Sequence, residues 1–318
     1  MRLAATTRSN VPATSTNPRV ARRRVDGVLL LDKPSGITSN TALMRVKRIF
    51  RAEKAGHTGT LDPLASGLLP ICFGEATKFA RFLLDAAKRY RASIRFGVTT
   101  TTQDAEGDIV DTRVVTTDRA QVEAVLPSFT GRIRQVPPAY SALKHQGRSH
   151  YEYARAGIEV PRAPRDITVE SLALVDWSAP LVTVDVLCSK GTYVRTLAAD
   201  IGEALGCGAH LAALRRVASG GFDVADAIDF ERLDAVESDA ARGALLLPVD
   251  SLVTSLPRIV VDDAGAACLR HGRLLPARDA DPEGLARAYD GAGRLLGVVR
   301  NEARVLAPVR MSACMAPG

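Results

Sequence analysis

Apolar and polar side chains alternate most regularly over residues 88–96. Tyr90, Ala92, Ile94 and Phe96 fall on one face of an extended chain, and Arg89, Arg91, Ser93 and Arg95 fall on the other. This period of two predicts a half-buried strand, with Tyr90 pointing toward the core or a cleft. Alternating valines predict a second strand around residues 182–186, and the apolar run 27–31 predicts a short buried strand.

Other segments have helical spacing or the residues that begin and end helices. Helices are predicted over residues 38–50, 75–84, 119–129, 194–205 and 264–270. The polar run 38–40 offers an N-terminal cap for the first helix, and Gly206 ends the fourth. Near the C-terminus, residues 290–291 predict a hairpin turn between short strands at 285–289 and 295–299.

Residues 56–67 have the composition of a tightly shaped loop. They include three glycines, which accept positive φ or a close neighbour, and Pro63 pushes the preceding Asp62 toward an extended conformation. Asp62 is the one carboxylate in this loop and has leucines around it, so its burial would require a partner for the charge. A tight turn in which Asp62 accepts hydrogen bonds from local N–H groups explains the same pattern.

The chain of 318 residues is long enough for two domains, and its 46% hydrophobic and 24% charged content is typical of a globular protein. No apolar run approaches the ~18 residues of a membrane span, and residues 1–24 lack the apolar segment of a secretory signal. Five widely spaced cysteines without a CxxC pair argue against a disulfide framework or a zinc site. We therefore expect a cytoplasmic protein without membrane association.

The net charge of +7 lies mostly in residues 1–24, which contain six arginines and no acid. We expect this basic tail to be disordered. A second basic segment, residues 131–165, has seven Lys/Arg against two Glu, with aromatic residues between them. Cations with aromatics suit a phosphate backbone and unstacked bases, whereas a mobile surface loop is the alternative. The acidic stretch 223–239 is expected to face away from RNA.

Two sets of arginines suggest anionic partners. Arg45, Arg48 and Arg51 form a basic row on the first predicted helix, which is either a solvated face or a phosphate contact. Arg195 falls near the start of a predicted helix, where the helix dipole disfavours a positive charge. This position favours a specific anionic partner for Arg195.

Residues 56–67, continuing through Lys78, resemble the active-site segment of the bacterial tRNA pseudouridine-55 synthases, the TruB family. Further segments similar to family signatures are residues 32–36, 88–90, 136–144, 188–197 and 208–216. The resemblance implies an α+β fold whose catalytic domain, residues 25–250, has a mixed, mainly antiparallel sheet with flanking helices. It also implies an RNA-clasping insertion at residues 131–165 and a small β-barrel-like, PUA-like RNA-binding domain at residues 251–318, with the basic tail 1–24 in front.

By this resemblance Asp62 carries the chemistry, Tyr90 stacks on the target base and assists removal of its C5 proton, and Arg195 pairs with Asp62. The resemblance adds three pocket-lining residues: Lys33, His57 and Leu214. The RNA contacts expected from the insertion are Arg132, Arg134, Tyr140, Lys144 and Arg148. An arginine partner is expected to lower the pKa of Asp62. Whether Asp62 attacks the sugar C1′ or the uracil C6, or acts as base at C2′, stays open.

The implied activity is the conversion of uridine to pseudouridine at position 55 in the T-loop of tRNA, after extrusion of the base. This isomerisation oxidises nothing and transfers no group, so we expect no cofactor and no metal; the chain has no phosphate-binding loop or metal-ligand spacing. The expected partner is the T-arm of tRNA, and the chain is expected to act as a monomer. Three alternatives remain: a tRNA-folding chaperone, a guide-RNA-dependent relative, and a metal-dependent hydrolase using His57 and Asp62.

Overall fold

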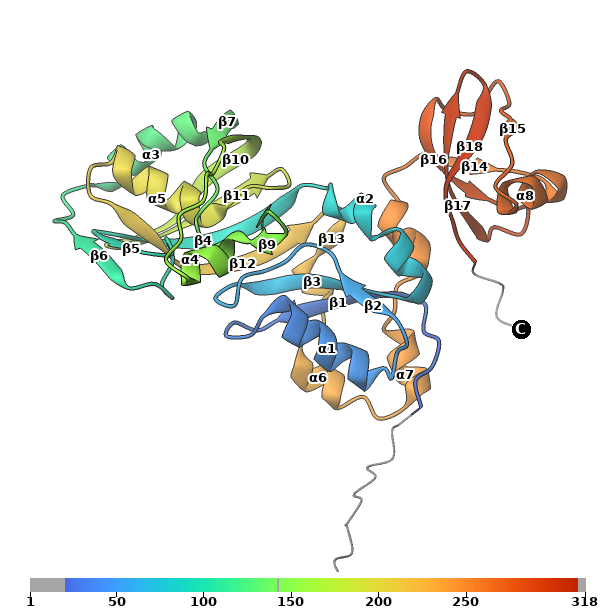
Figure 1. Cartoon of the computed structure of the whole chain (residues 1–318), viewed down its shortest axis with the longest axis horizontal. Coiled ribbons are helices and arrows are strands. Elements are labelled where there is room, and N and C mark those ends of the chain that lie inside the picture. Colours follow the sequence, from blue (N-terminus) through green and yellow to red (C-terminus); the bar gives the residue numbers. More distant parts are fainter. Residues whose placement is uncertain (1–20, 142, 314–318) are drawn as a thin grey trace, which may run out of the picture.

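The computed structural model describes residues 21–141 and 143–313, so most of the basic tail lies outside the described residues. A nine-stranded sheet runs through the larger part of the molecule (Figure 1). Its main path is β1 (Gly27–Lys33), β3 (Ser66–Phe73), β12 (Ala209–Ser219), β4 (Lys88–Phe96), β11 (Leu181–Cys188), β10 (Arg165–Ser178) and β7 (Gly131–Gln135). Strand β2 (Ala55–His57) pairs with β3, and β13 (Phe222–Asp223) pairs with β12. Every pairing is antiparallel except β12 with β3, which confirms the mixed, mainly antiparallel sheet.

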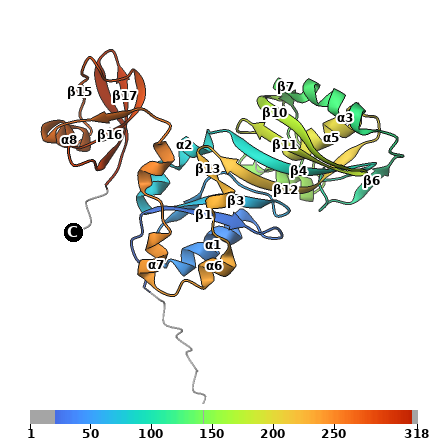
Figure 2. The same cartoon turned by 180° about the vertical axis from the view of Figure 1, so that it is seen from behind.

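Helices flank the two ends of this sheet. One end, near β1, carries α1 (Ser39–Ile49), α6 (Phe230–Asp234) and α7 (Asp239–Ala244), whereas the other carries α3 (Arg119–Val125) and α5 (Val194–Ala204) (Figures 1 and 2). A single apolar cluster includes buried residues from both ends, such as Leu29, Ile94 and Leu197. The parallel contact between β3 and β12 therefore joins two halves of one continuous core.

The predicted alternating strand is confirmed as β4. Ala92, Ile94 and Phe96 are at most 1% exposed, and on the other face Arg89, Arg91 and Arg95 are exposed. The first predicted helix is confirmed as α1, because the hydroxyl of Thr38 accepts a hydrogen bond from the backbone N–H of Thr41 at 3.0 Å.

The helix predicted over residues 75–84 is wrong as a single element. The chain forms a 3₁₀ helix, η1 (Gly74–Lys78), and then the short α2 (Ala80–Leu84). Gly74 has φ +50°, and an added Cβ would lie 2.1 Å from the Asp26 carboxylate, which accepts a hydrogen bond from Glu75 N at 2.7 Å. This long-range contact fixes the start of η1. The predicted helix divides at Phe79, between η1 and α2, where φ is −103° and the side chain is fully buried.

The helix predicted over residues 119–129 also changes type before its end. It is α3 as far as Val125 and then the 3₁₀ helix η2 (Leu126–Phe129). Pro127 lies at the start of η2, where its missing N–H cannot continue the α-helical hydrogen bonds.

The basic segment 131–165 is not wholly an excursion from the core. Its first residues form β7, the edge strand of the main sheet, paired with β10. The remainder contains the hairpin β8 (Lys144–His145) and β9 (Arg148–Ser149), followed by α4 (His150–Arg155). Another hairpin, β5 (Val98–Thr100) with β6 (Ile109–Thr112), encloses the turn at residues 104–107.

A second, five-stranded sheet is built from the end of the chain, in the order β14, β16, β17, β18, β15. Its strands are β14 (Arg258–Val260), β15 (Leu275–Pro276), β16 (Gly284–Tyr289), β17 (Leu295–Glu302) and β18 (Val305–Met311), with α8 (Asp263–Arg270) beside them. The predicted turn is confirmed, since the Asp290 carboxylate accepts hydrogen bonds from Ala292 N at 3.1 Å and Arg294 N at 3.0 Å.

This C-terminal sheet packs against the larger part of the molecule through apolar side chains and a hydrogen bond. Val298 belongs to the same apolar cluster as Val28 and Leu68 of the large sheet. The hydroxyl of Tyr289 donates to the carboxylate of Asp250 at 2.7 Å. Asp250 lies in the 3₁₀ helix η4 (Val249–Val253); the remaining short helix is η3 (Val224–Asp226).

Candidate active site

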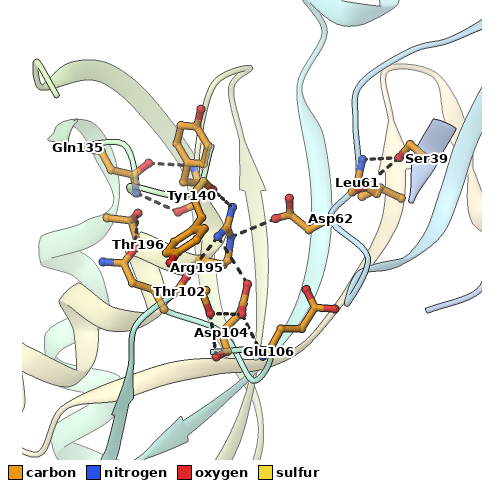
Figure 3. A network of polar contacts seen from close by, with 12 residues as sticks. Ser39, Leu61, Asp62, Thr102, Asp104, Glu106, Gln135, Tyr140, Arg195 and Thr196 are labelled. Atoms are coloured by element: carbon orange, nitrogen blue, oxygen red, sulfur yellow. Dashed lines mark hydrogen bonds and ion pairs between the residues drawn. The ribbon is translucent and has the colours of Figure 1, made fainter. Parts of the chain in front are cut away.

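The glycine-rich loop between β2 and β3 is anchored by α1. The Ser39 hydroxyl accepts a hydrogen bond from Leu61 N at 2.8 Å and donates one to Leu61 O at 3.0 Å. Leu61 is 3% exposed, and Pro63 O accepts a hydrogen bond from Gly36 N at 2.8 Å. With Leu61 held in this way, the side chain of Asp62 extends away from α1 (Figure 3).

Arg195 meets Asp62 across the gap between the loop and α5. Nε of Arg195 lies 3.0 Å from Oδ2 of Asp62, and the Arg195 side chain is 7% exposed. The guanidinium also donates to Thr102 O at 3.2 Å and Tyr140 O at 2.8 Å. The predicted anionic partner of Arg195 is thus present, and the pairing with Asp62 is confirmed (Figure 3).

The start of α5 is fixed by the edge strand β7. The side-chain amide of Gln135 donates to Tyr193 O at 3.1 Å and accepts from Tyr193 N at 2.8 Å. Tyr193 is the residue before α5, so Gln135 fixes the position of the first turn of α5, which carries Arg195. The placement of Arg195 therefore depends on the sheet as well as on α5.

Asp104 is a second acidic partner of Arg195 that the sequence did not predict. Its Oδ2 lies 3.5 Å from Nη1 of Arg195, and its side chain is 3% exposed. Oδ1 accepts hydrogen bonds from the Thr102 hydroxyl and from Glu106 N. In the sequence Asp104 is an ordinary turn residue, and its role appears only when the β5–β6 hairpin lies against α5 (Figure 3). One guanidinium is therefore shared by two carboxylates.

Arg195 lowers the pKa of Asp62 as expected, but other causes outweigh its effect. Burial raises the pKa of Asp62, Arg195 lowers it, Asp104 raises it, and the net direction is upward. The Asp62 side chain keeps 43% of its surface exposed, whereas Asp104 is almost fully buried. The pKa of Glu106 is raised as well, through its own burial and the charges of Asp104 and Asp62. The site thus has an acidic character that a single arginine does not neutralise.

Lys33 is fully buried at the end of β1. Its Nζ donates to Pro34 O at 2.9 Å and Ile37 O at 2.7 Å, so it holds the turn that precedes α1. Burial lowers the pKa of Lys33 to about 8, although the negative charge of Asp62 acts in the opposite direction. Lys33 therefore lies within electrostatic reach of Asp62, at the position expected for a site-lining residue.

Tyr90 and Leu214 come from the central strands of the sheet. Tyr90, on β4, is half-buried and packs against the main apolar cluster. Burial raises the pKa of Tyr90, Arg216 lowers it, and Asp62 raises it, so the phenol lies near both charges. Leu214 is 9% exposed and faces Ala92 across the β12–β4 pair, on the apolar side of the same sheet.

His57, the last residue of β2, has a buried Nδ1 with no hydrogen-bond partner in the described part of the chain. Burial lowers the pKa of His57, and the charge of Arg216 lowers it further. A neutral imidazole follows, which cannot form an ion pair with Asp62. Within residues 21–141 and 143–313, no group of three or more His, Cys, Asp or Glu residues could hold a metal ion.

The candidate RNA contacts are spread over the insertion and are engaged to different degrees. Arg132 pairs with Asp166 at 2.9 Å and Arg148 pairs with Glu152 at 3.6 Å, which partly neutralises both arginines. Arg134 and Lys144 are exposed. Of the five, Tyr140 contacts the active site: its backbone carbonyl oxygen accepts a hydrogen bond from Arg195. These residues come from different elements: Arg132 and Arg134 lie on β7, Lys144 and Arg148 lie on the β8–β9 hairpin, and Tyr140 lies in the segment between.

Arg45 and Arg48 of the predicted basic row lie on α1, whereas Arg51 lies beyond its end with φ +51°, and acids pair with most of the row. Arg45 pairs with Asp234, and Arg51 pairs with Asp239. Both acids belong to the stretch 223–239, which therefore lies directly against this row. Of the three arginines in the row, Arg48 alone has no ion pair among the described residues.

The fold and the site fit one class of enzyme, the pseudouridine synthases, and family comparisons give the same answer. The model of the N-terminal domain of TruB family pseudouridylate synthases matches residues 47–194. That of the tRNA pseudouridylate synthase B C-terminal domain matches residues 195–254, and that of the pseudouridine synthase II TruB C-terminal domain matches residues 257–311. The chain belongs to the TruB family and is an isomerase that forms pseudouridine in tRNA.

Curated relatives named tRNA pseudouridine synthase B support this assignment. The protein from Thiobacillus denitrificans is 56% identical over 92% of this chain and 98% of its own length. That from Burkholderia mallei is 57% identical over 93% of this chain and 97% of its own length.

Solved structures of lower sequence identity have the same fold. A chain in the crystal structure of a Cbf5-Nop10-Gar1 complex has a TM-score of 0.68 and 27% identity, over 91% of this chain and 84% of that chain. A chain of an H/ACA RNP bound to a substrate RNA containing 2'-deoxyuridine has a TM-score of 0.67 and 25% identity, over 91% and 85%. None of the helices in the described ranges is long and apolar enough to cross a membrane.

Proposed function

We propose that this enzyme converts uridine 55 in the T-loop of tRNA to pseudouridine, and that Asp62 is its catalytic residue. The observation that carries the proposal is the ion pair of Asp62 with the buried Arg195, 3.0 Å apart. Arg195 fixes the direction of the carboxylate, and the exposed part of Asp62 is left to meet an extruded base. The reaction breaks the N1–C1′ bond, turns the uracil and joins C1′ to C5; C5 loses its proton and N1 gains one, so atoms and electrons balance without an added reagent.

The ionised form of Asp62 is the reactive one whether it attacks C1′ or C6 or takes a proton at C2′. Arg195 favours this form, while burial and the neighbouring Asp104 oppose it. A carboxylate whose pKa is raised is a stronger base and nucleophile when it is ionised. The shared guanidinium keeps enough stabilisation for ionisation without quenching this reactivity.

Tyr90 and Leu214 supply the surfaces against which the uracil is held. A base stacked on an aromatic ring gains about 1–3 kcal/mol, and extrusion of a stacked base costs a few kcal/mol. Stacking on Tyr90 therefore offsets much of the extrusion cost. Leu214 forms the apolar wall, Lys33 supports the turn before α1, and His57, as a neutral side chain, supports the start of the loop.

The remaining binding energy comes from regions outside the site. In this proposal the catalytic domain spans residues 25–250, its insertion 131–165 clasps the T-arm, and the PUA-like domain 251–318 binds further RNA. The Tyr140 carbonyl on Arg195 connects the insertion to the active site. The basic tail, residues 1–24, adds non-specific attraction to the RNA. The chain acts as a monomer in the cytoplasm, without metal or cofactor.

The decisive experiment incubates purified Asp62→Asn protein with unmodified elongator tRNA and maps pseudouridine by mass. We expect tRNA binding close to that of the wild type and no product at the T-loop uridine. Asp111→Asn is the matched control, because Asp111 forms an exposed ion pair with Arg113 and has no ion pair with Arg195 among the described residues; it should retain full activity. Product from Asp62→Asn above background would refute the role of Asp62. Wild-type activity at another uridine would refute the assigned position, and a requirement for a guide RNA would favour the mode suggested by the H/ACA relatives.

A further inference from the structure

Arg216 on β12 is the largest fully buried side chain of the described residues, with 1% of its surface exposed. Its Nε donates to Leu68 O at 2.7 Å, and its Nη2 donates to Gly59 O at 3.0 Å. Leu68 belongs to β3 and Gly59 to the loop that carries Asp62. One guanidinium therefore ties the catalytic loop to the strand that follows it.

The same side chain reaches Tyr90. Arg216 and Tyr90 are direct partners in the antiparallel pair of β12 and β4, so they project from the same face of the sheet. The charge of the guanidinium lowers the pKa of the phenol. Arg216 thus lies beside the stacking residue in the sheet and is hydrogen-bonded to the loop of Asp62.

Two of the three glycines in the loop make room for Arg216. Gly59 has φ +77°, and a Cβ there would lie 3.2 Å from Nη1 of Arg216. Gly67 has φ +98°, and a Cβ there would lie 2.3 Å from the backbone oxygen of Arg216. Gly56, by contrast, has nothing within 4 Å of the corresponding point. Gly59 therefore leaves space for the guanidinium of Arg216, whereas Gly67 allows the backbone of β12 to approach closely.

The charge of Arg216 has no carboxylate partner among the described residues. Its neighbour Arg215 forms a two-point ion pair with Asp32, at 3.0 and 2.6 Å, and lies on the exposed side. An unpaired buried cation is costly, and an apolar side chain of similar volume is often as stable. Packing alone therefore does not account for an arginine at position 216.

We propose that Arg216 is a positioning residue of the isomerisation: it holds the hydroxyl end of Tyr90 and the backbone at Gly59 in one fixed arrangement, so that the stacked uracil meets Asp62. This inference rests on the proposed roles of Asp62 and Tyr90. Arg216 itself touches neither the base nor the carboxylate. A misplacement of about 1 Å between ring and carboxylate is enough to cost about 100-fold in rate.

The test compares Arg216→Gln and Arg216→Lys with Arg215→Gln, a matched control at the next position. For Arg216→Gln we expect a single-turnover rate about 100-fold lower, with the tRNA dissociation constant changed by less than about threefold. Arg216→Lys keeps the charge and should recover part of the rate. Arg215→Gln should stay within about threefold of the wild type in rate.

A spectroscopic readout separates positioning from a purely structural role. Since Arg216 lowers the pKa of Tyr90, its removal should raise that pKa further. The phenolate absorbance of each variant is titrated against the same variant carrying Tyr90→Phe. A folded Arg216→Gln protein with a wild-type rate, or one that loses rate while the Tyr90 titration stays unchanged, would overturn the proposal.

If Arg216→Gln does not fold, Gly59→Ala provides the second variant. Its Cβ presses on Nη1 while the guanidinium remains, and we expect a rate loss of about tenfold with near-normal tRNA binding. An unchanged rate in Gly59→Ala would overturn the proposal. An inactive Asp62→Asn beside a fully active Arg216→Gln rejects the positioning role alone, whereas an active Asp62→Asn rejects the proposed function.

Discussion

The catalytic loop and the basic insertion 131–165 hold their cations in opposite ways. Arg195, which meets the loop, is 7% exposed and makes its contacts to atoms far away in sequence. In the insertion, Arg132 is 77% exposed and pairs with Asp166 on the neighbouring strand β10. A residue whose role depends on angstrom-level geometry is fixed by tertiary contacts. A residue that supplies charge to a phosphate backbone needs only to be accessible.

Of these substitutions, Arg195→Gln should have the largest effect, both on the stability of the protein and on the rate of the reaction. It leaves Asp104 buried without its cation, so we expect a loss of about 3–5 kcal/mol in the free energy of unfolding. The single-turnover rate should fall by more than about 100-fold, because Asp62 loses its orientation. Denaturant unfolding and rapid-quench kinetics measure the two effects. Arg113→Gln removes an exposed arginine paired with Glu203 and should change the stability and the rate only slightly. If it lowered both as much as Arg195→Gln does, burial of the cation would not explain the effect.

Tyr90→Ala tests how much the aromatic ring in the buried site contributes to the rate. Loss of about 1–3 kcal/mol of stacking corresponds to roughly a 5- to 150-fold lower rate, with most of the tRNA affinity retained. Tyr90→Phe keeps the ring and should recover the stacking part. If Tyr90→Phe were as slow as Tyr90→Ala, the hydroxyl rather than the ring would carry the function.

The pH dependence of the rate tests the raised pKa of Asp62. Since the ionised carboxylate is the reactive form, the rate should rise with pH through a pKa above the ordinary aspartate value. Asp104→Asn removes one of the charges that raise this pKa, so the limb of the profile should move to lower pH. A limb that stays in place would show that Asp104 does not act on Asp62.

The stability of the protein should also depend on Lys33 at alkaline pH. Its pKa is about 8 in the folded state and 10.5 as the ordinary value, so between these values the unfolded chain binds more protons. The free energy of unfolding therefore rises with pH across this window. Lys33→Met should remove the part that Lys33 contributes, while Lys88, whose pKa is also lowered to about 8, keeps its own part. Thermal unfolding of both proteins at several pH values between about 8 and 10 measures it.

The smallest effects are expected in the insertion. Lys144→Ala should weaken tRNA binding modestly and reduce the salt dependence by about one phosphate contact. Arg132→Ala should do less, because Asp166 already matches its charge. Binding measured over a range of salt concentrations compares the two variants. A larger loss for Arg132 would mean that its pair with Asp166 opens on RNA binding.

Much of the local structure could be predicted from sequence because it depends on neighbours along the chain. The alternation around Ile94 and the Thr38 cap are examples. The helix predicted over residues 75–84 divides at Phe79, which is fully buried in an apolar cluster with Leu68 and Val298, and no local pattern shows this packing. The pairing of Arg195 with Asp62 was expected from the family resemblance, and no local pattern encodes it.

The sequence by itself determined which faces are buried, where helices begin, and that a glycine-shaped loop surrounds Asp62. The fold was needed to show that Asp104 shares Arg195, that the guanidinium of Arg216 lies against Gly59, and that the pKa of Asp62 is raised. The physical reason is range. The periodicity of apolar residues indicates which side chains are buried over a few positions. The pKa of a site residue depends on charges and burial contributed by strands that only the fold brings together.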